Sequence, residues 1–222
     1  MGTNLDLTAS DGHVLAAYLA LPESKPRGGL VVIQEAFGVT AYVRSVCDAY
    51  ARDGYASIAP AIYDRQRRDA VFDGSPAPEA LAEALRLRAA LEWPKVMLDV
   101  QAAIDEVRSA GRVGIVGYCA GGSVAWLAAL SLPLAAASCY YGRDIVDFLD
   151  RAPLCPTILH FGEHDRFIPL ADVERIRAAF PSVPNYVYPA GHGFDGAGER
   201  RDEASARLAR ERTLELFRRH VG

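Results

Sequence analysis

The stretch Arg112–Leu130, RVGIVGYCAGGSVAWLAAL, decides how the rest of the chain is interpreted. An apolar run leads into residues 117–121, GYCAG, and a second apolar run follows at once. A nucleophile between two glycines, where a buried strand turns sharply into a helix, is the pattern of a nucleophile elbow, here with cysteine in place of serine. Glycines are favoured beside it because the turn is strained and brings backbones close together. We therefore expect Cys119 at the tip of a strand-to-helix turn, the alternative being a structural cysteine in a Gly-rich turn.

Strand and helix patterns alternate around this unit. Apolar runs without polar alternation are typical of strands buried on both faces, and they are GLVVIQ (29–34), YASIAP (55–60), AAASCYY (135–141), PTILHFG (156–162) and NYVYPA (185–190). Helical patterns cover 42–52, 78–91, 95–109, 121–131, 171–180 and 202–220, and an N-terminal hairpin turns at Asp11-Gly12. The sequence predicts an α/β-hydrolase fold, with helices on both faces of a mostly parallel sheet of about seven or eight strands. No linker divides the chain, so we expect a single domain over 1–222.

Composition narrows the classes of partner. The 222 residues carry a net charge of −4, without the basic stripe that nucleic acids require. No apolar run approaches the roughly 20 residues that span a bilayer, and the N-terminus lacks the apolar region of a secretory signal. We expect a cytoplasmic protein with a small-molecule partner, no nucleic acid and no membrane. The four cysteines form no C-x-x-C pair, which argues against a metal site and favours free thiols.

In this fold the partners of the nucleophile follow it in the order acid, histidine, at the ends of later strands. Asp165 stands in the loop after PTILHFG, and His192 stands in the loop after NYVYPA. We predict that Asp165 orients His192 and that His192 takes the thiol proton and later activates water. The backbone amide of Ala120 is expected to bind the developing oxyanion. Alternatives are a helix-capping role for Asp165, and His164 as the base.

Five segments together, GLVVIQEAFG, VGIVGYCAGG, the YYG at 140–142, HFGEHDRFIP and YPAGHGF, resemble the dienelactone hydrolase (carboxymethylenebutenolidase) family from about Leu30 to the C-terminal helix. The resemblance implies a Cys119, His192 and Asp165 triad without a metal or organic cofactor. It also implies that Glu35 contacts the thiol and helps to form the thiolate, that the Ala36 amide is a second oxyanion donor, and that Phe37 faces the pocket. For Glu35 the alternative is an ion pair with Arg143 or Arg166.

The implied chemistry is thiolate attack on a lactone carbonyl, release of an enolate, and hydrolysis of the thioester by water. Substrates of the family carry a carboxylate held by arginines, one of them shortly after the catalytic histidine. The four positions after His192 hold no arginine, so this group is absent or displaced to Arg200 or Arg201. Arg86 and Arg88 are further candidate anchors, with plain solvation as the alternative.

The leading hypothesis is therefore a hydrolase that opens a lactone or ester. The alternatives are a broader carboxylesterase that acts on neutral esters, and a noncatalytic binding protein on the same fold. We expect a monomer, with a dimer as the alternative. The polar run at 63–78 is interpreted either as a surface loop or as a lid over the site.

Overall fold

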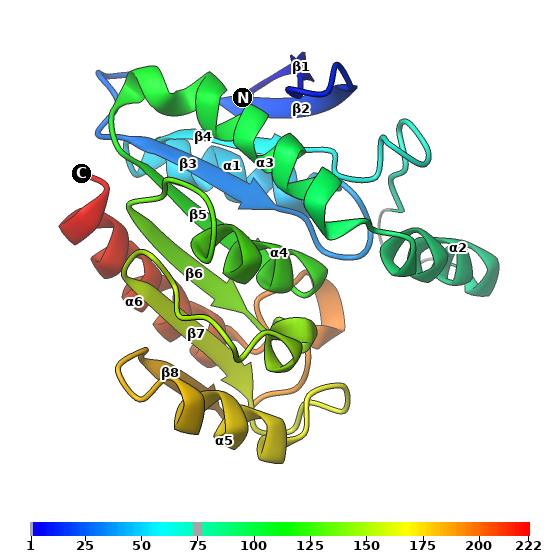
Figure 1. Ribbon diagram of the computed structural model, residues 1–222, viewed down its shortest axis with the longest axis vertical. Coiled ribbons are helices and arrows are strands. Elements are labelled where there is room, and N and C mark those ends of the chain that lie inside the picture. The colour runs from blue at the N-terminus through cyan, green and yellow to red at the C-terminus, as the bar shows by residue number, and fades with distance from the viewer. Residues whose placement is uncertain (1, 73–76) are drawn as a thin grey trace.

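The computed structural model describes residues 2–72 and 77–222, whose strands form one eight-stranded sheet (Figure 1). The strand order is β1-β2-β4-β3-β5-β6-β7-β8. The bounds are β1 Thr3–Thr8, β2 Val14–Ala20, β3 Gly29–Ile33, β4 Ala56–Pro60, β5 Val113–Tyr118, β6 Ala136–Tyr140, β7 Thr157–Gly162 and β8 Asn185–Tyr188. Only the hairpin β1–β2 and its pairing with β4 are antiparallel. The predicted α/β-hydrolase fold with a mostly parallel sheet is confirmed.

Helices cover both faces of the sheet, with α3 and α4 in front of it and α1 and α6 behind it (Figure 1). Their bounds are α1 Ala41–Arg52, α2 Pro78–Ala89, α3 Trp93–Val107, α4 Ala120–Ala129, α5 Leu170–Ala179 and α6 Glu203–His220. Short 3-10 helices are η1 Arg108–Ala110, η2 Arg143–Asp147 and η3 Gly198–Arg200. Local chemistry fixes several ends: the side chains of Thr40 and Asp202 accept hydrogen bonds from first-turn amides of α1 and α6. Pro94 lies in the first turn of α3, where its missing N–H needs no partner, so this helix begins earlier than the predicted residue 95.

The burial pattern explains why the central strands lack polar alternation. Every residue of β3, β4, β5, β6 and β7 is buried, as expected for parallel strands with helices on both sides. Helix α4 is buried along its whole length, so its sequence shows no polar face. No helix of the described residues is long and apolar enough to cross a membrane.

The carboxyl ends of the parallel strands meet at one edge of the sheet, the right-hand side of Figure 1. The turns after β3, β5, β7 and β8 carry the predicted site residues to this edge. In the 63–78 run, Tyr63 is buried, and residues 66–69 are exposed. Positions 73–76 lie outside the described residues, and a lid there stays a prediction.

Candidate active site

The elbow after β5 holds Cys119 in a backbone conformation that side chains rarely adopt, with φ +55°. Its amide donates to the carbonyl of Tyr140 at 3.0 Å, which ties the turn to β6. A Cβ at Gly117 would lie 1.8 Å from the Gly121 carbonyl oxygen, and a Cβ at Gly121 would lie 2.5 Å from the carbonyl oxygens of Ile33 and Gln34. Both glycines are therefore required by close backbone approach, and the strain concentrates at the nucleophile.

The three predicted triad residues meet at the elbow. Nε2 of His192 lies 3.2 Å from Sγ of Cys119, and Nδ1 lies 2.7 Å from Oδ2 of Asp165. The other carboxylate oxygen of Asp165 accepts hydrogen bonds from the amides of Phe167 and Ile168 at 2.8 and 3.2 Å. The rival His164 is exposed on the surface and makes no triad contact in the described structure. Asp165 thus caps its own loop and orients the imidazole at the same time.

The surroundings of His192 favour its charged form. Burial alone would lower the pKa of His192, but the hydrogen bonds to Asp165 and Cys119 outweigh it and raise that pKa from 6.5 to about 10. The ring is held between Tyr141 and Phe167, whose ring centroids each lie 5.1 Å away. An imidazolium beside the sulfur is suited to stabilising a thiolate.

Glu35 stands two positions after the end of β3 and is 4% exposed. Burial raises the pKa of its carboxyl above the ordinary value, while the charges of Arg200 and His192 act in the opposite direction. The arginine whose charge acts on Glu35 is therefore Arg200, and the described residues show no ion pair of Glu35 with Arg143 or Arg166, the alternative considered from the sequence. A carboxylate with a raised pKa, next to the triad, is a competent proton acceptor.

The two backbone amides predicted for the oxyanion belong to the residues that follow Cys119 and Glu35 in the chain. Ala120 opens helix α4 directly after Cys119, where backbone N–H groups lack partners inside the helix. The carbonyl of Glu35 accepts from Nε2 of Gln34 at 3.4 Å. Because the N–H and C=O of a trans peptide point in opposite directions, the Ala36 amide is directed away from Gln34. Both amides remain candidate oxyanion donors.

The structure distinguishes Arg200 from Arg201, which the sequence spacing alone could not do. The guanidinium of Arg200 lies over the ring of Phe37, with its central carbon 5.4 Å from the centroid, and this places both residues beside Glu35. Arg201 points elsewhere, to Glu203 and to the Asp195 carbonyl.

The two arginines of helix α2 are engaged in ion pairs. Arg86 is mostly exposed and pairs with Glu83, so the geometry does not support it as a substrate contact. Arg88 is half-buried and binds Asp144 at 2.7 Å. The charge of Arg88 nevertheless lowers the pKa of Tyr63, and Cys119 raises the pKa of the same tyrosine, so both groups lie near Tyr63. Arg88 therefore lies closer to the site than Arg86, but its charge is committed to Asp144.

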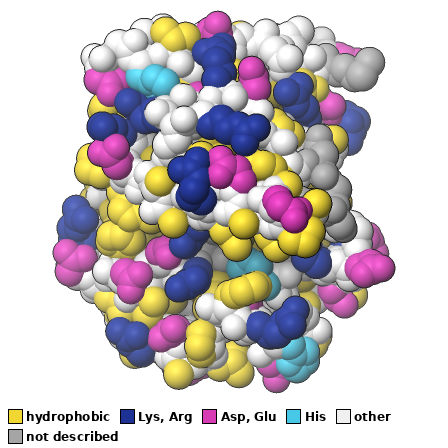
Figure 2. Space-filling model, turned by 90° about the vertical axis from the view of Figure 1, so that its right-hand side faces the viewer, with side chains coloured by type: hydrophobic (Ala, Val, Ile, Leu, Met, Phe, Trp, Pro, Cys, Tyr) yellow, Lys and Arg dark blue, Asp and Glu magenta, His cyan; other side chains and the backbone are white. Residues whose placement is uncertain are grey.

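Aromatic residues not predicted from the sequence complete the site. Tyr141 is fully buried, has φ +38°, and its hydroxyl finds no hydrogen-bond partner among the described residues. Phe167 covers the edge of the His192 ring and is 58% exposed. Figure 2 shows this face of the molecule, where a histidine lies recessed among hydrophobic side chains. Both aromatic residues stand in segments that carry the family resemblance, YYG and RFIP, which was the available signal.

Asp195 was also missed from the sequence. It is 7% exposed, and the Tyr42 hydroxyl donates to its carbonyl at 2.6 Å and to its carboxylate at 3.0 Å. Tyr42 belongs to α1, which follows the Glu35 turn, and Asp195 belongs to the His192 loop. These bonds therefore connect two loops of the site. Among the described residues, no group of three or more His, Cys, Asp or Glu side chains is arranged to hold a metal ion.

Comparison with known proteins places this geometry in a family. The model of the dienelactone hydrolase family matches residues 15–221. The chain belongs to the dienelactone hydrolase family. It is 33% identical to a carboxymethylenebutenolidase of Pseudomonas putida, over 96% of this chain and 94% of that protein. It is 29% identical to carboxymethylenebutenolidase 1 of Cupriavidus pinatubonensis, over 98% and 97% of the two chains.

A solved structure agrees with this assignment. The crystal structure of a candidate dienelactone hydrolase from Klebsiella pneumoniae superposes with a TM-score of 0.84 at 27% identity, covering 99% of this chain and 100% of the other. The protein is accordingly a hydrolase of this family.

Proposed function

We propose that this hydrolase opens lactones or esters by nucleophilic attack of the Cys119 sulfur. The observation that carries the proposal is the hydrogen-bonded chain from Sγ of Cys119 through His192 to Asp165, with contacts of 3.2 and 2.7 Å. A noncatalytic binding protein would have no use for such an alignment or for the strained backbone at Cys119.

In the first step the thiolate attacks the carbonyl carbon, and the carbonyl oxygen becomes an oxyanion between the amides of Ala120 and Ala36. The ring C–O bond then breaks, and the leaving enolate or alkoxide oxygen takes its proton from the His192 imidazolium, which leaves the imidazole neutral. Water, deprotonated by His192, attacks the resulting thioester, and the thiol is released. No step calls for a metal or an organic cofactor.

Arg200 supports a substrate with an acidic group. Its guanidinium lies over the Phe37 ring and its charge acts on Glu35, so a carboxylate of the substrate would compete with Glu35 for the positive charge. With the charge of Arg200 neutralised by the substrate, Glu35 would become a stronger proton acceptor toward the thiol. We propose that Arg200 supplies from a later position the charge that the family places soon after the histidine.

The second candidate function is the hydrolysis of neutral esters, and one observation favours it. Phe167 presents an exposed apolar ring at the edge of His192, and such a surface favours an uncharged acyl or leaving group. The two candidates differ in the ratio of kcat/KM for an anionic dienelactone to that for a neutral p-nitrophenyl ester.

The test is a burst experiment with p-nitrophenyl acetate and mass spectrometry of the quenched protein. We expect one acyl group per chain on Cys119, and its absence in Cys119→Ala. Cys155→Ala is the matched control because Cys155 is also a partly exposed free thiol. Turnover by Cys119→Ala at the wild-type rate would overturn the proposal.

Cellular location and assembly remain proposals. The four cysteines are free thiols, which fits a reducing compartment such as the cytoplasm. We propose a single domain that works as a monomer.

A further inference from the structure

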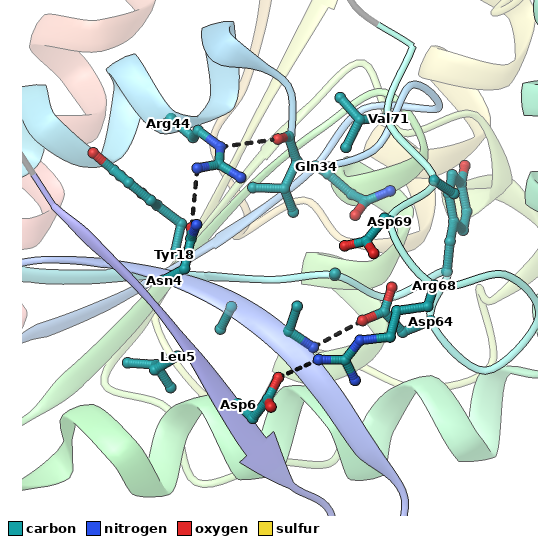
Figure 3. A pocket seen from close by; sticks show the side chains of 16 residues that line it. Asn4, Leu5, Asp6, Tyr18, Gln34, Arg44, Asp64, Arg68, Asp69 and Val71 are labelled. Atoms are coloured by element: carbon teal, nitrogen blue, oxygen red, sulfur yellow. Dashed lines mark hydrogen bonds and ion pairs between the residues drawn. The ribbon is translucent and has the colours of Figure 1, made fainter.

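A cavity of about 310 Å³ lies beside the N-terminal hairpin, and no triad residue lines it (Figure 3). Strands β1 and β2, the turn after β3 and the segment 61–71 form its walls. Its volume is at the lower end of the range for small-molecule sites, which begins at about 300 Å³. Nothing in the proposed hydrolysis uses this cavity.

Gln34 contributes an unsatisfied acceptor to the cavity. The residue is fully buried, and its Nε2 donates to the Glu35 carbonyl. Its Oε1 is buried and has no hydrogen-bond partner among the described residues. Figure 3 shows the amide of Gln34 directed toward the side of the cavity where Asp69 and Asp64 lie. A buried carbonyl without a donor is costly, so the site favours a molecule that brings one.

Asp64 contributes a second unsatisfied acceptor. Its Oδ2 accepts from the amide of Ala16 at 2.8 Å, whereas its Oδ1 is buried without a partner in the described part of the chain. Burial raises the pKa of Asp64, since the compensation from the backbone N–H groups of Ala16 and Asp69 and from the charge of Arg68 is smaller. The guanidinium of Arg68 is itself hydrogen-bonded to Asp6.

The remaining charged groups of the wall indicate whether a bound ligand is a cation or an anion. Arg44, the other cation of the wall, donates to the Val39 carbonyl and to Asn4. The carboxylate of Asp69 lies at the exposed mouth of the cavity. The three carboxylates of the wall therefore outnumber its two guanidinium groups, and both unsatisfied atoms are acceptors.

We propose that this cavity binds a small organic cation through a primary ammonium group held by Gln34, Asp64 and Asp69. An ammonium carries three donors and no acceptor, which matches three acceptors and a net negative wall. The carbon chain of the ligand lies against the apolar part of the wall, formed by Leu5, Val39 and Val71. The site is distinct from the triad and requires no turnover.

The test uses n-butylammonium chloride and amide-detected NMR of the full chain, with the Ala16 N–H as reporter because it donates to Asp64. We expect saturable shifts with a dissociation constant on the order of 1 mM, as suits so small a ligand. Two probes control for chemistry: n-butanol has a similar chain without charge, and tetramethylammonium has charge without N–H donors. Neither should produce the saturable shifts.

Two variants localise the site. Asp64→Asn keeps an acceptor for Ala16 but removes the charge, and Gln34→Met removes the buried carbonyl at similar length. We expect each to weaken binding by about tenfold or more, the loss of a charge-assisted hydrogen bond. Asp6→Asn, which changes the net charge equally at an exposed pair on the same wall, should weaken it by less than about twofold.

Specific outcomes overturn the proposal. These are absence of shifts with n-butylammonium, equal shifts with n-butanol, or wild-type affinity in both Asp64→Asn and Gln34→Met. Saturable shifts with calcium chloride but none with n-butylammonium would also overturn the proposal, because they would indicate a metal-ion site. Thermal unfolding of each variant establishes that it is folded, and the probe series on the wild-type protein decides the question even where one variant is not.

Discussion

Replacing Asp165 by asparagine tests the triad with little disturbance of the loop. The amides of Phe167 and Ile168 donate to Oδ1 at 2.8 and 3.2 Å, so they hold the oxygen of the new side chain in that place. Its NH₂ group must then face Nδ1 of His192, where Oδ2 stood at 2.7 Å. A donor in that position forces Nδ1 to accept. The ring proton moves to Nε2, which can no longer accept the proton of Cys119.

The magnitude follows from the electrostatics of the histidine. A rise of its pKa from 6.5 to about 10 corresponds to roughly 5 kcal/mol in favour of the imidazolium, contributed by Asp165 and Cys119 together. The analogous substitution in a serine triad lowers kcat by about 10⁴-fold through the wrong tautomer. We expect the acylation rate here to fall by about 10³-fold, equivalent to roughly 4 kcal/mol of transition-state stabilisation.

Stability should change with a defined pH dependence. A pKa raised in the folded state contributes stability that is complete below about pH 6.5 and lost as the pH rises to about 10. The difference in free energy of unfolding between wild type and Asp165→Asn should therefore be largest below pH 6.5 and close toward pH 10.

The assay is stopped-flow acylation by p-nitrophenyl acetate, combined with NMR titration of the His192 ring. Asp172→Asn is the matched control, because Asp172 lies in the first turn of α5 and pairs only with the exposed Arg175. Acylation by Asp165→Asn within about tenfold of wild type would refute the triad assignment. A wild-type His192 that titrates at its ordinary pKa would refute the electrostatic argument.

Three further predictions concern the surroundings of the triad. Arg200→Met should raise KM for an anionic dienelactone by about tenfold or more and leave neutral p-nitrophenyl esters nearly unchanged; equal effects on both would exclude an anionic anchor. Gly117→Ala should abolish soluble expression or lower the Tm strongly, because a Cβ would meet the Gly121 carbonyl at 1.8 Å; a wild-type melting curve would contradict the elbow geometry. Burial raises the pKa of Asp195 from 3.8 to about 6, so ionisation costs stability as the pH rises through this interval. Urea unfolding should show that Asp195→Asn removes up to about 3 kcal/mol of that decline, and parallel curves for the two proteins would contradict it.

The fold was predictable because its signals are local. Uninterrupted apolar runs mark strands covered on both faces, and one elbow with its glycines fixes where the nucleophile stands. The order of acid and histidine then follows from the topology, and the structure brings His192 to hydrogen-bonding distance of Cys119 and Asp165 to hydrogen-bonding distance of His192. Helix ends were less predictable, as at Trp93, because a proline is compatible with the first turn of a helix.

The parts of the site that could not be predicted depend on contacts between distant segments. Tyr42 and Asp195 are separated by more than 150 positions, and neither belongs to a motif that marks their hydrogen bond. Helix α2 offered Arg86 as a candidate anchor by composition alone. Its partner Glu83 stands one turn away, so the helix satisfies that charge locally on its exposed face.

The position of Arg200 near Glu35 depends on how the loop after His192 turns, and the spacing of residues in the sequence does not show this turn. Gly193 has φ +76°, and the amide of Gly196 donates to the Gly193 carbonyl at 2.8 Å, so the chain turns back directly after His192. A Cβ at Gly193 would meet Arg200 at 3.6 Å, and a Cβ at Gly196 would lie 3.5 Å from the Glu35 carboxylate and 3.9 Å from Arg200. The two glycines thus leave open the space that Arg200 enters. A Cβ at position 196 would also press on the Gly193 carbonyl oxygen at 3.0 Å, so the turn must shift beside Glu35 and Arg200. Gly196→Ala should therefore impair an anionic substrate more than a neutral one, and kcat/KM for the two substrate classes is the measurement that decides it.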